Sequence, residues 1–590
     1  MSQSPSQEVG APIPNNTAHA ISVTLPTWEA TVGYEEGEEW VTSKMHSGYP
    51  RFFIHEIIQD LAKAIESKYG REGERCMIFP SYNTAKRCRE FIKQKTETSN
   101  IMVRVLRLRT PAPTTDFEKS SVVESEIGIV LFPASEFPLA KQYWQHSGEG
   151  ISSRMAEYVL KQLFENEQKD QARLRSRNKQ ELQAQSIQKK SPSITASIRT
   201  NSMGQNEEAE REFNTFIEQK YGRVLDLKFA KEAKLALRRR ICGKADKSHN
   251  QEEEMDKARR GKFLSETDVY LYPTGMASIF NAHQAVLGVE TEPKKSVCFG
   301  FPYVDTLNIL KKFGPGCYFL GHGDDSSLDT LEADLESGET QISALFCECP
   351  SNPLLKTPDL QRIKKLSEKY NFLVIVDETV GNFLNISVLP YADMVVSSLT
   401  KVFSGDSNVM GGSLILNPLS SNYKKLKSYF NENYEDLYWA EDALYLERNS
   451  RDFEARARMI DENAEEVVQL LQGSDIISEV YYPSLSPSKN HYDAVKTPNG
   501  GYGGLVSILF KEPRHAITFF NAINLHKGPS LGTNFTLACP YSILAHYQEL
   551  DEIEQWGVDR NLVRISIGIE ERDSLLDVLN SSLEIAAKDV

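Results

Sequence analysis

Between residues 266 and 420, short apolar runs alternate with longer segments whose apolar residues have helical spacing. The apolar runs predict strands near 295–300, 316–320, 342–347, 371–377, 393–398 and 411–416. The segments between most of them predict helices near 276–288, 304–313, 327–336 and 358–370. This alternation predicts an α/β fold with a mostly parallel sheet that is covered by helices on both faces. In such sheets ligands bind where the strands end at their carboxyl edge.

Outside this region the pattern changes. A buried strand is predicted at 127–132, whereas the segment from about 165 to 210 is rich in Gln, Lys, Arg, Ser and Asn and poor in large apolar residues. A second polar insert lies at 243–260. The predicted units are an N-terminal extension domain (1–165), a polar linker (166–210), a large domain with an N-terminal arm (211–425) and a smaller C-terminal α/β domain (426–590).

The bulk composition excludes several classes of protein. The net charge of −15 argues against a general nucleic-acid binder and against binding to an anionic membrane surface. We see no apolar run long enough to span a bilayer and no secretion signal. The eight cysteines form no zinc-ligand pattern, so we expect no metal site and reduced thiols in a cytoplasmic protein.

Two strand ends carry the clearest chemistry. Asp377 ends the apolar run at 372–377, and Lys401 follows the run at 395–396 and two hydroxyl residues. At the ends of neighbouring parallel strands, a lysine amine can bind the aldehyde of pyridoxal phosphate while an aspartate keeps the ring nitrogen protonated. This pair therefore predicts an enzyme that depends on pyridoxal 5′-phosphate.

A phosphate site is suggested by Gly275, which precedes a predicted helix. A glycine at a helix start lets backbone N–H groups approach an anion, and the helix dipole adds attraction. Taken alone, the motif favours an ordinary helix start; its place at the first helix of the alternating region favours a phosphate. Ser398 and Thr400 would donate hydroxyl hydrogen bonds to the same group.

Three further residues are candidates for the site, and each has two possible roles or two possible binding partners. Tyr303 follows a strand and either stacks on a cofactor ring or is an ordinary core tyrosine. Asn352 lies between two prolines in a rigid loop, where its amide can donate to a ring oxygen or a substrate carboxylate. Arg564 opens a strand of the small domain and is either a clamp for an α-carboxylate or a surface ion pair.

Taken in order, these segments resemble the γ-family of fold-type I pyridoxal-phosphate enzymes of cysteine and methionine metabolism. The resemblance covers about Phe213 to Ala587. It is most specific at 376–379, at 398–401 with 409–412, and at 564–570. The family includes cystathionine γ-synthase, the cystathionine lyases, O-acetylhomoserine sulfhydrylase and methionine γ-lyase. The long N-terminal extension makes the chain most similar to fungal members of the γ-synthase type.

The resemblance implies a role for each candidate residue. Lys401 would carry the cofactor, Asp377 would face the ring nitrogen, and Lys401 and Tyr303 would move protons. The implied cofactor-binding residues are Gly275, Met276, Tyr303, Asp377, Ser398, Thr400, Lys401, Tyr221 and Arg223. The implied substrate-binding residues are Asn352, Ser530 and Arg564. In the family the Tyr-x-Arg motif reaches the neighbour's cofactor phosphate, so the resemblance implies a homodimer, or the usual homotetramer, with shared active sites.

The implied reaction replaces the acyl group of O-acylhomoserine, acetyl or succinyl, with cysteine to give cystathionine, as in trans-sulfuration and methionine biosynthesis. The alternatives are an O-acylhomoserine sulfhydrylase, which uses sulfide, a cystathionine lyase, or a catalytically silent regulatory paralogue. Three motifs depart from the family pattern: 303–306, 377–379 and 404–406. They leave the choice of thiol and of leaving group open.

The extension contains an echo of the catalytic region. The segment 48–51, Gly-Tyr-Pro-Arg, is similar to 220–223, Lys-Tyr-Gly-Arg, and 79–85 is similar to 272–277. One hypothesis is a decayed partial copy of the front half of the catalytic domain; the other is an unrelated interface domain. A different strand order would exclude the copy. In either case we expect the extension to pack on the catalytic region without catalysing.

Overall fold

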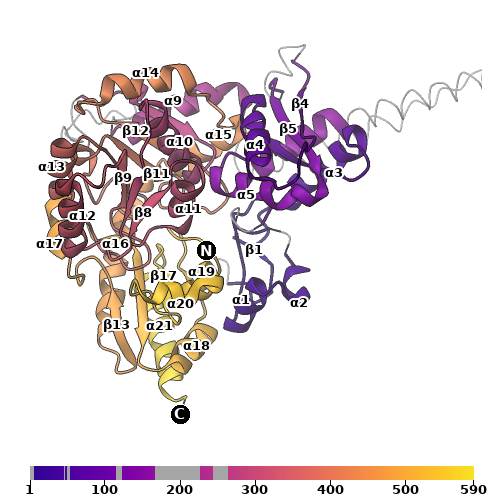
Figure 1. The fold of residues 1–590 in the computed structure, drawn as a ribbon. Coiled ribbons are helices and arrows are strands. Elements are labelled where there is room, and N and C mark those ends of the chain that lie inside the picture. Colours follow the sequence, from indigo (N-terminus) through magenta and orange to yellow (C-terminus); the bar gives the residue numbers. More distant parts are fainter. Residues whose placement is uncertain are drawn as a thin grey trace, which may run out of the picture.

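Three main sheets organise the chain (Figure 1). The computed structural model describes residues 5–45, 47–49, 53–113, 122–165, 226–243 and 263–589. Within them, the sheets have seven, five and three strands and belong to the large domain, the C-terminal domain and the N-terminal extension, respectively. The predicted linker and nearly all of the second polar insert lie outside the described residues. The predicted α/β fold class, with its extra N-terminal domain, is confirmed.

The central sheet is mostly parallel, as predicted. Its strands, in spatial order, are β6 (Val269–Tyr272), β12 (Gly412–Leu416), β11 (Met394–Ser398), β10 (Leu373–Asp377), β9 (Ala344–Glu348), β7 (Ser296–Phe299) and β8 (Cys317–Leu320). β12 is antiparallel to both of its neighbours, and the other pairings are parallel. Six strands match the predicted apolar runs, and β6 is additional. Because β10 and β11 are neighbours, Asp377 and the loop to Lys401 leave the sheet at the same edge.

Helices surround this sheet: α9 (Ala230–Ile241), α10 (Gly275–Gly288), α11 (Val304–Lys312), α12 (Asp325–Ser337), α13 (Leu360–Tyr370), α14 (Tyr423–Asn433) and α15 (Ala440–Asn449). The strands show why both faces need covering. Val374 and Val376 belong to one buried cluster, whereas Leu373 and Ile375 belong to another. Since successive strand residues point to opposite faces, a fully apolar strand such as β10 is stable only between two layers of helices.

The C-terminal domain has a second sheet, with strands in the order β13 (Ile477–Tyr481), β14 (Leu505–Phe510), β17 (Val563–Ser566), β16 (Leu537–Pro540) and β15 (His526–Lys527). Its helices are α16 (Phe453–Gln472), α17 (Lys489–Val495), α18 (Pro513–Ala522), α19 (Tyr541–His546), α20 (Leu550–Glu554) and α21 (Arg572–Ala587). Arg564 lies on β17, between β14 and β16 in the sheet. A residue on a strand with two hydrogen-bonded neighbours is held rigidly, which suits a binding role.

The N-terminal extension has its own sheet, in the order β3 (Glu74–Phe79), β5 (Glu126–Pro133) and β4 (Arg104–Arg109). Its helices are α3 (Glu56–Tyr69), α4 (Tyr82–Lys95), α5 (Phe137–Ser147) and α6 (Ser153–Leu160), preceded by β1 (Pro12–Ile13), β2 (Ser22–Val23), α1 (Trp28–Glu35) and α2 (Glu39–Thr42). β5 lies between β3 and β4 in this sheet, whereas β6, the strand matched to β3, lies at the edge of the central sheet and is separated from β7 and β8 by other strands. The strand order of the two regions is different. The hypothesis of a front-half copy is therefore wrong.

The extension packs on the catalytic region, as expected. In Figure 1 it lies, in purple, beside the large domain, where α5 contacts α10 and α11 and α6 contacts α15. Gly148, after α5, accepts a hydrogen bond through its carbonyl from Thr274 Oγ1 (2.9 Å). His146 Nδ1 lies 3.0 Å from Asp305 Oδ1, and both side chains are buried. Asp305 is one of the departures from the family pattern, and the extension supplies its partner.

Two further properties concern the chain as a whole. No helix within the described ranges is long and apolar enough to cross a bilayer. All eight cysteines fall within the described residues, and all are free thiols. Seven of them are buried, which fits a structural role for reduced thiols.

Stability is expected to depend on pH through His283, which is buried on α10. Burial lowers the pKa of His283 to about 4, from an ordinary value of 6.5. Below pH 6.5 the unfolded chain binds a proton that the folded chain does not, so stability falls as the pH drops from 6.5 towards 4. The loss from this group should reach roughly 3 kcal/mol. Thermal unfolding at pH 7 and pH 5 should show a smaller pH effect in His283→Gln than in the wild type; equal effects would contradict this.

Candidate active site

A cavity of about 140 Å³ lies between the carboxyl edge of the central sheet and the C-terminal domain. It brings together ten of the twelve residues proposed from the sequence: Gly275, Met276, Tyr303, Asn352, Asp377, Ser398, Thr400, Lys401, Ser530 and Arg564. The other two, Tyr221 and Arg223, lie outside the described residues. The cavity thus collects side chains from strand ends and loops that are far apart in the sequence.

Lys401 lines this cavity and is buried, with 6% of its surface exposed. It lies in the loop after β11, and its Nζ atom is 3.1 Å from Ser530 Oγ and 3.2 Å from Tyr49 Oη. Ser530 has a φ of +105°, a backbone conformation that non-glycine residues rarely adopt. Strain of this kind persists where the surroundings enforce it, often at functional sites. Here it accompanies the hydroxyl that contacts the lysine.

Asp377, which is partly buried, lies beside the buried carboxyl group of Glu348. The two residues are direct partners across β10 and β9. Burial, together with the charge of Asp377, raises the pKa of Glu348 well above its usual range. Burial also raises the pKa of Asp377, while hydrogen bonds from Thr379 and the charge of Lys401 oppose this rise. A cation at Asp377 would relieve the cost of a buried carboxylate, and a protonated pyridine nitrogen is such a cation.

Glu348 also fixes two neighbouring residues. Its Oε1 accepts a hydrogen bond from the Tyr303 N–H (2.5 Å), and its Oε2 accepts one from the Asn352 N–H (3.0 Å). Tyr303 is only partly buried and lines the cavity, so the core interpretation of this tyrosine is wrong. Its hydroxyl points to the sulfur of Met276 at 3.4 Å. Our sequence interpretation did not propose Glu348 as a site residue, although a strand-end glutamate next to the strand of Asp377 was a usable signal.

The start of α10 allows another group to come close to its backbone N–H groups. Thr274 caps the helix by accepting a hydrogen bond from the Ala277 N–H (3.0 Å). A Cβ atom at Gly275 would lie 2.6 Å from Ser398 Cβ, so only glycine fits there. The first N–H groups of a helix have no partner within the helix, and they carry its positive dipole end. This turn, with the hydroxyls of Ser398 and Thr400 beside it, can hold a phosphate.

Arg564 reaches the same cavity from β17 and is buried, with 6% exposed, which excludes the surface ion pair. Its Nη1 donates to Asn352 Oδ1 (3.0 Å), and its Nη2 donates to the Ser530 carbonyl (2.6 Å). Its guanidinium lies 4.9 Å from the centre of the Tyr541 ring. These contacts hold a positively charged fork at the cavity wall, a geometry that matches a carboxylate.

Together these residues fit pyridoxal phosphate. The cavity offers a buried amine for the aldehyde, a partly buried carboxyl group for the ring nitrogen, an aromatic side chain, and a helix start at Gly275 for the phosphate. The chemistry of each donor matches one part of the cofactor. Tyr49, from the N-terminal extension, was not expected in this cavity.

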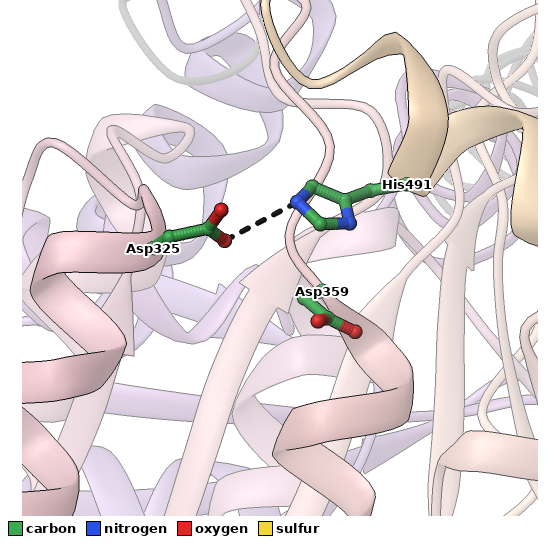
Figure 2. Close-up of side chains that lie close together, drawn as sticks. All are labelled: Asp325, Asp359 and His491. Atoms are coloured by element: carbon green, nitrogen blue, oxygen red, sulfur yellow. Dashed lines mark ion pairs between the residues drawn. The ribbon is translucent and has the colours of Figure 1, made fainter.

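A separate cluster lies where α12 and α13 meet α17 (Figure 2). His491 points towards Asp325, with its Nε2 3.2 Å from Asp325 Oδ1, and Asp359 lies nearby. The second carboxylate, Asp359, caps α13 by accepting from the Arg362 N–H (3.0 Å). The ion pair links α17 to α12, and the cap explains why Asp359 lies at the start of α13.

Comparisons with known proteins agree with this chemistry. Residues 250–584 match the family described as Cys/Met metabolism PLP-dependent enzyme. Residues 57–152 match the N-terminal domain of fungal trans-sulfuration enzymes. One match therefore covers the region of the cavity-forming strands, and the other covers most of the extension.

Over its whole length the chain is similar to cystathionine γ-synthases. It is 46% identical to that of Neurospora crassa over 620 residues, covering 99% of each chain. It is 43% identical to that of Saccharomyces cerevisiae over 660 residues, covering 98% of this chain and 99% of the relative. In structure it is similar to the cystathionine γ-synthase from Xanthomonas oryzae pv. oryzae in complex with cystathionine, with a TM-score of 0.49, 23% identity, and coverage of 61% of this chain and 99% of that one.

Proposed function

The chain belongs to the Cys/Met metabolism PLP-dependent enzyme family, and from this premise we propose that it is a cystathionine γ-synthase. Membership of the family confirms the resemblance that the motifs predicted, and it confirms pyridoxal phosphate as the cofactor. The observation that carries the proposal is the 46% identity to a cystathionine γ-synthase over 99% of both chains. The proposed substrates are an O-acylhomoserine and cysteine.

The reaction exchanges one bond at the γ-carbon of the acylated amino acid. The carbon–oxygen bond breaks, and acetate or succinate leaves with the bonding electron pair. The cysteine sulfur forms the new carbon–sulfur bond and loses its proton, so cystathionine and a carboxylic acid are the products. Bound pyridoxal phosphate supplies an electron sink next to the α-carbon.

The residues of the chain divide the remaining work. Lys401 Nζ accepts the α-proton, and Lys401 or Tyr303 moves protons at the β-carbon. Arg564 binds the α-carboxylate, with Asn352 and Ser530 holding its guanidinium in place. The mostly apolar lining of the cavity strengthens these charged contacts because it lowers the local dielectric constant.

For the cofactor, we assign the ring nitrogen to Asp377 and the ring face to Tyr303. We assign the phosphate to the turn at Gly275 and Met276 and to the hydroxyl groups of Ser398 and Thr400. Tyr221 and Arg223 would reach the phosphate of a neighbouring subunit, which makes the enzyme a homodimer or homotetramer. We also keep the predicted domain boundaries and the cytoplasmic location as parts of the proposal.

The function is tested by supplying O-acetylhomoserine or O-succinylhomoserine with either cysteine or sulfide and identifying the product by mass. We expect cystathionine, with a kcat/KM for cysteine at least about tenfold above that for sulfide, a modest discrimination for an enzyme pocket. Homocysteine as the main product would indicate a sulfhydrylase. Breakdown of cystathionine without synthesis would indicate a lyase. Absence of turnover with every substrate pair would indicate a catalytically silent regulatory paralogue.

A further inference from the structure

We infer that the N-terminal extension completes the active site of its own chain. In this inference the hydroxyl of Tyr49 forms a hydrogen bond with the Lys401 amine and so positions it. The inference rests on the proposed function, because it concerns the base of that reaction. It goes beyond it in giving the extension a part in catalysis, which neither the family likeness nor the sequence pattern assigned. Tyr49 and Lys401 are 352 residues apart in one chain.

The contacts around the amine carry the inference. Lys401 Nζ lies between two hydroxyl groups, one from the extension at 3.2 Å and one from Ser530 of the C-terminal domain at 3.1 Å. It also lies 4.7 Å from the centre of the Tyr49 ring. A tyrosine hydroxyl can accept from an ammonium and donate to a neutral amine, and its ring attracts the cation. Tyr49 can therefore hold the amine in both protonation states.

Two hydrogen bonds hold the extension close to the loops that carry Lys401 and Ser530. The Ile21 N–H donates to the carbonyl of Ser407, which follows Lys401 in the chain (3.0 Å). Ser22 Oγ donates to the carbonyl of Pro529, which precedes Ser530. The extension is thus attached to both the loop that carries Lys401 and the loop that carries Ser530.

A second set of contacts links this attachment to Tyr49 itself. Ser47 Oγ donates to the Ala20 carbonyl at 2.6 Å, and both residues are buried. A Cβ atom at Gly48 would lie 2.7 Å from Phe53 Cβ, so the chain passes closely against Phe53 just before Tyr49. The Phe53 N–H also donates to the Tyr49 carbonyl (3.2 Å). These contacts hold Ser47, Gly48 and Tyr49 close to Ala20 and Phe53 and limit where the tyrosine hydroxyl can lie.

The chain carries two Tyr-x-Arg motifs, at 49–51 and at 221–223. The family likeness assigns the second motif to the neighbour's cofactor. The structure places the tyrosine of the first motif in the cavity of its own chain. The motif at 221–223 is therefore expected to serve the active site of the neighbouring subunit, and Tyr49 the active site of its own subunit. This difference can be measured.

The role of the hydroxyl is tested in the full-length holoenzyme with Tyr49→Phe, which keeps the ring and removes the hydroxyl. The control is Tyr158→Phe in the same extension, whose hydroxyl bonds the backbone of Val123 (2.7 and 2.8 Å) and does not line the cavity. In Tyr49→Phe we expect the pH midpoint of the cofactor's visible absorbance to fall by about one unit, because the protonated form loses an acceptor. We expect kcat to fall about 10- to 100-fold with little change in KM.

A purely structural tyrosine would give a different result. Tyr158→Phe should lower the melting temperature and leave the pH midpoint unchanged. If Tyr49→Phe also changes only the melting temperature, the inference is overturned. Absence of the visible band in the wild-type protein would instead overturn the proposed function, so the two failures are distinguishable.

Mixed oligomers test whether Tyr49 serves the active site of its own chain. They are purified from two differently tagged chains, one carrying Lys401→Ala and the other Tyr49→Ala. If Tyr49 serves its own chain, no site is intact, and the activity stays at or below that of Tyr49→Ala alone. If it serves the neighbour, about half of the wild-type activity returns, since one of every two sites is then intact. That recovery would overturn the inference. The pair Lys401→Ala with Arg223→Ala is the comparison, for which the family likeness predicts recovery.

Discussion

Lys401→Ala is expected to abolish the visible absorbance of bound pyridoxal phosphate and to lower turnover by at least about 10⁴-fold, the order found when a covalent catalytic group is deleted. In the proposed function, this amine both binds the cofactor aldehyde and accepts the substrate α-proton. The groups that hydrogen-bond its Nζ atom are the hydroxyls of Tyr49 and Ser530, which are far weaker bases than an amine. Absorbance spectra and steady-state kinetics of the purified variant measure both effects.

The matched control is Lys427→Ala, on α14 and away from the cavity. Lys427 Nζ bonds Asp268 Oδ1 at 3.0 Å, so its loss removes a lysine and an ion pair without touching the site. We expect this variant to keep the visible band and full turnover. A Lys401→Ala protein with measurable cystathionine synthesis would exclude Lys401 as the base and the cofactor-bearing residue.

The strands and helices of the large domain were predictable because its sequence obeys local rules. β10 is apolar at four consecutive positions and ends in Asp377, since both of its faces are buried and only its carboxyl end meets the cavity. The helix at Gly275 could be placed from its threonine cap and glycine. The ten described candidate residues meet because parallel strands bring their carboxyl ends to one edge.

What the sequence did not predict depends on contacts between distant segments. Tyr49 enters the cavity because the extension docks on loops near Lys401 and Ser530, and no local pattern encodes that docking. Asp305 looked like a departure from the family, yet it pairs with His146 of the extension. The importance of Glu348 follows from the register between β9 and β10, which single strands do not reveal.

Arg564→Lys is expected to raise the KM for O-acetylhomoserine by about 30- to 100-fold, equivalent to roughly 2–3 kcal/mol of lost binding, with kcat changed much less. Lysine keeps the charge but cannot form two parallel hydrogen bonds to a carboxylate. It would also leave either Asn352 Oδ1 or the Ser530 carbonyl without its buried donor. The visible cofactor band should remain, since Arg564 is assigned to the substrate and not to the cofactor.

The cause is isolated by comparing O-acetylhomoserine with its α-carboxamide. The wild type should prefer the carboxylate strongly, and Arg564→Lys should lose most of that preference, because the fork recognises two oxygens that share a negative charge. Arg362→Lys is the control: Arg362 bonds Glu332 (2.8 Å) and Asp329 (2.7 Å) between α12 and α13, outside the cavity, and its replacement should leave KM unchanged. If Arg564→Lys discriminated between the two substrates as well as the wild type does, the α-carboxylate would have to bind another residue.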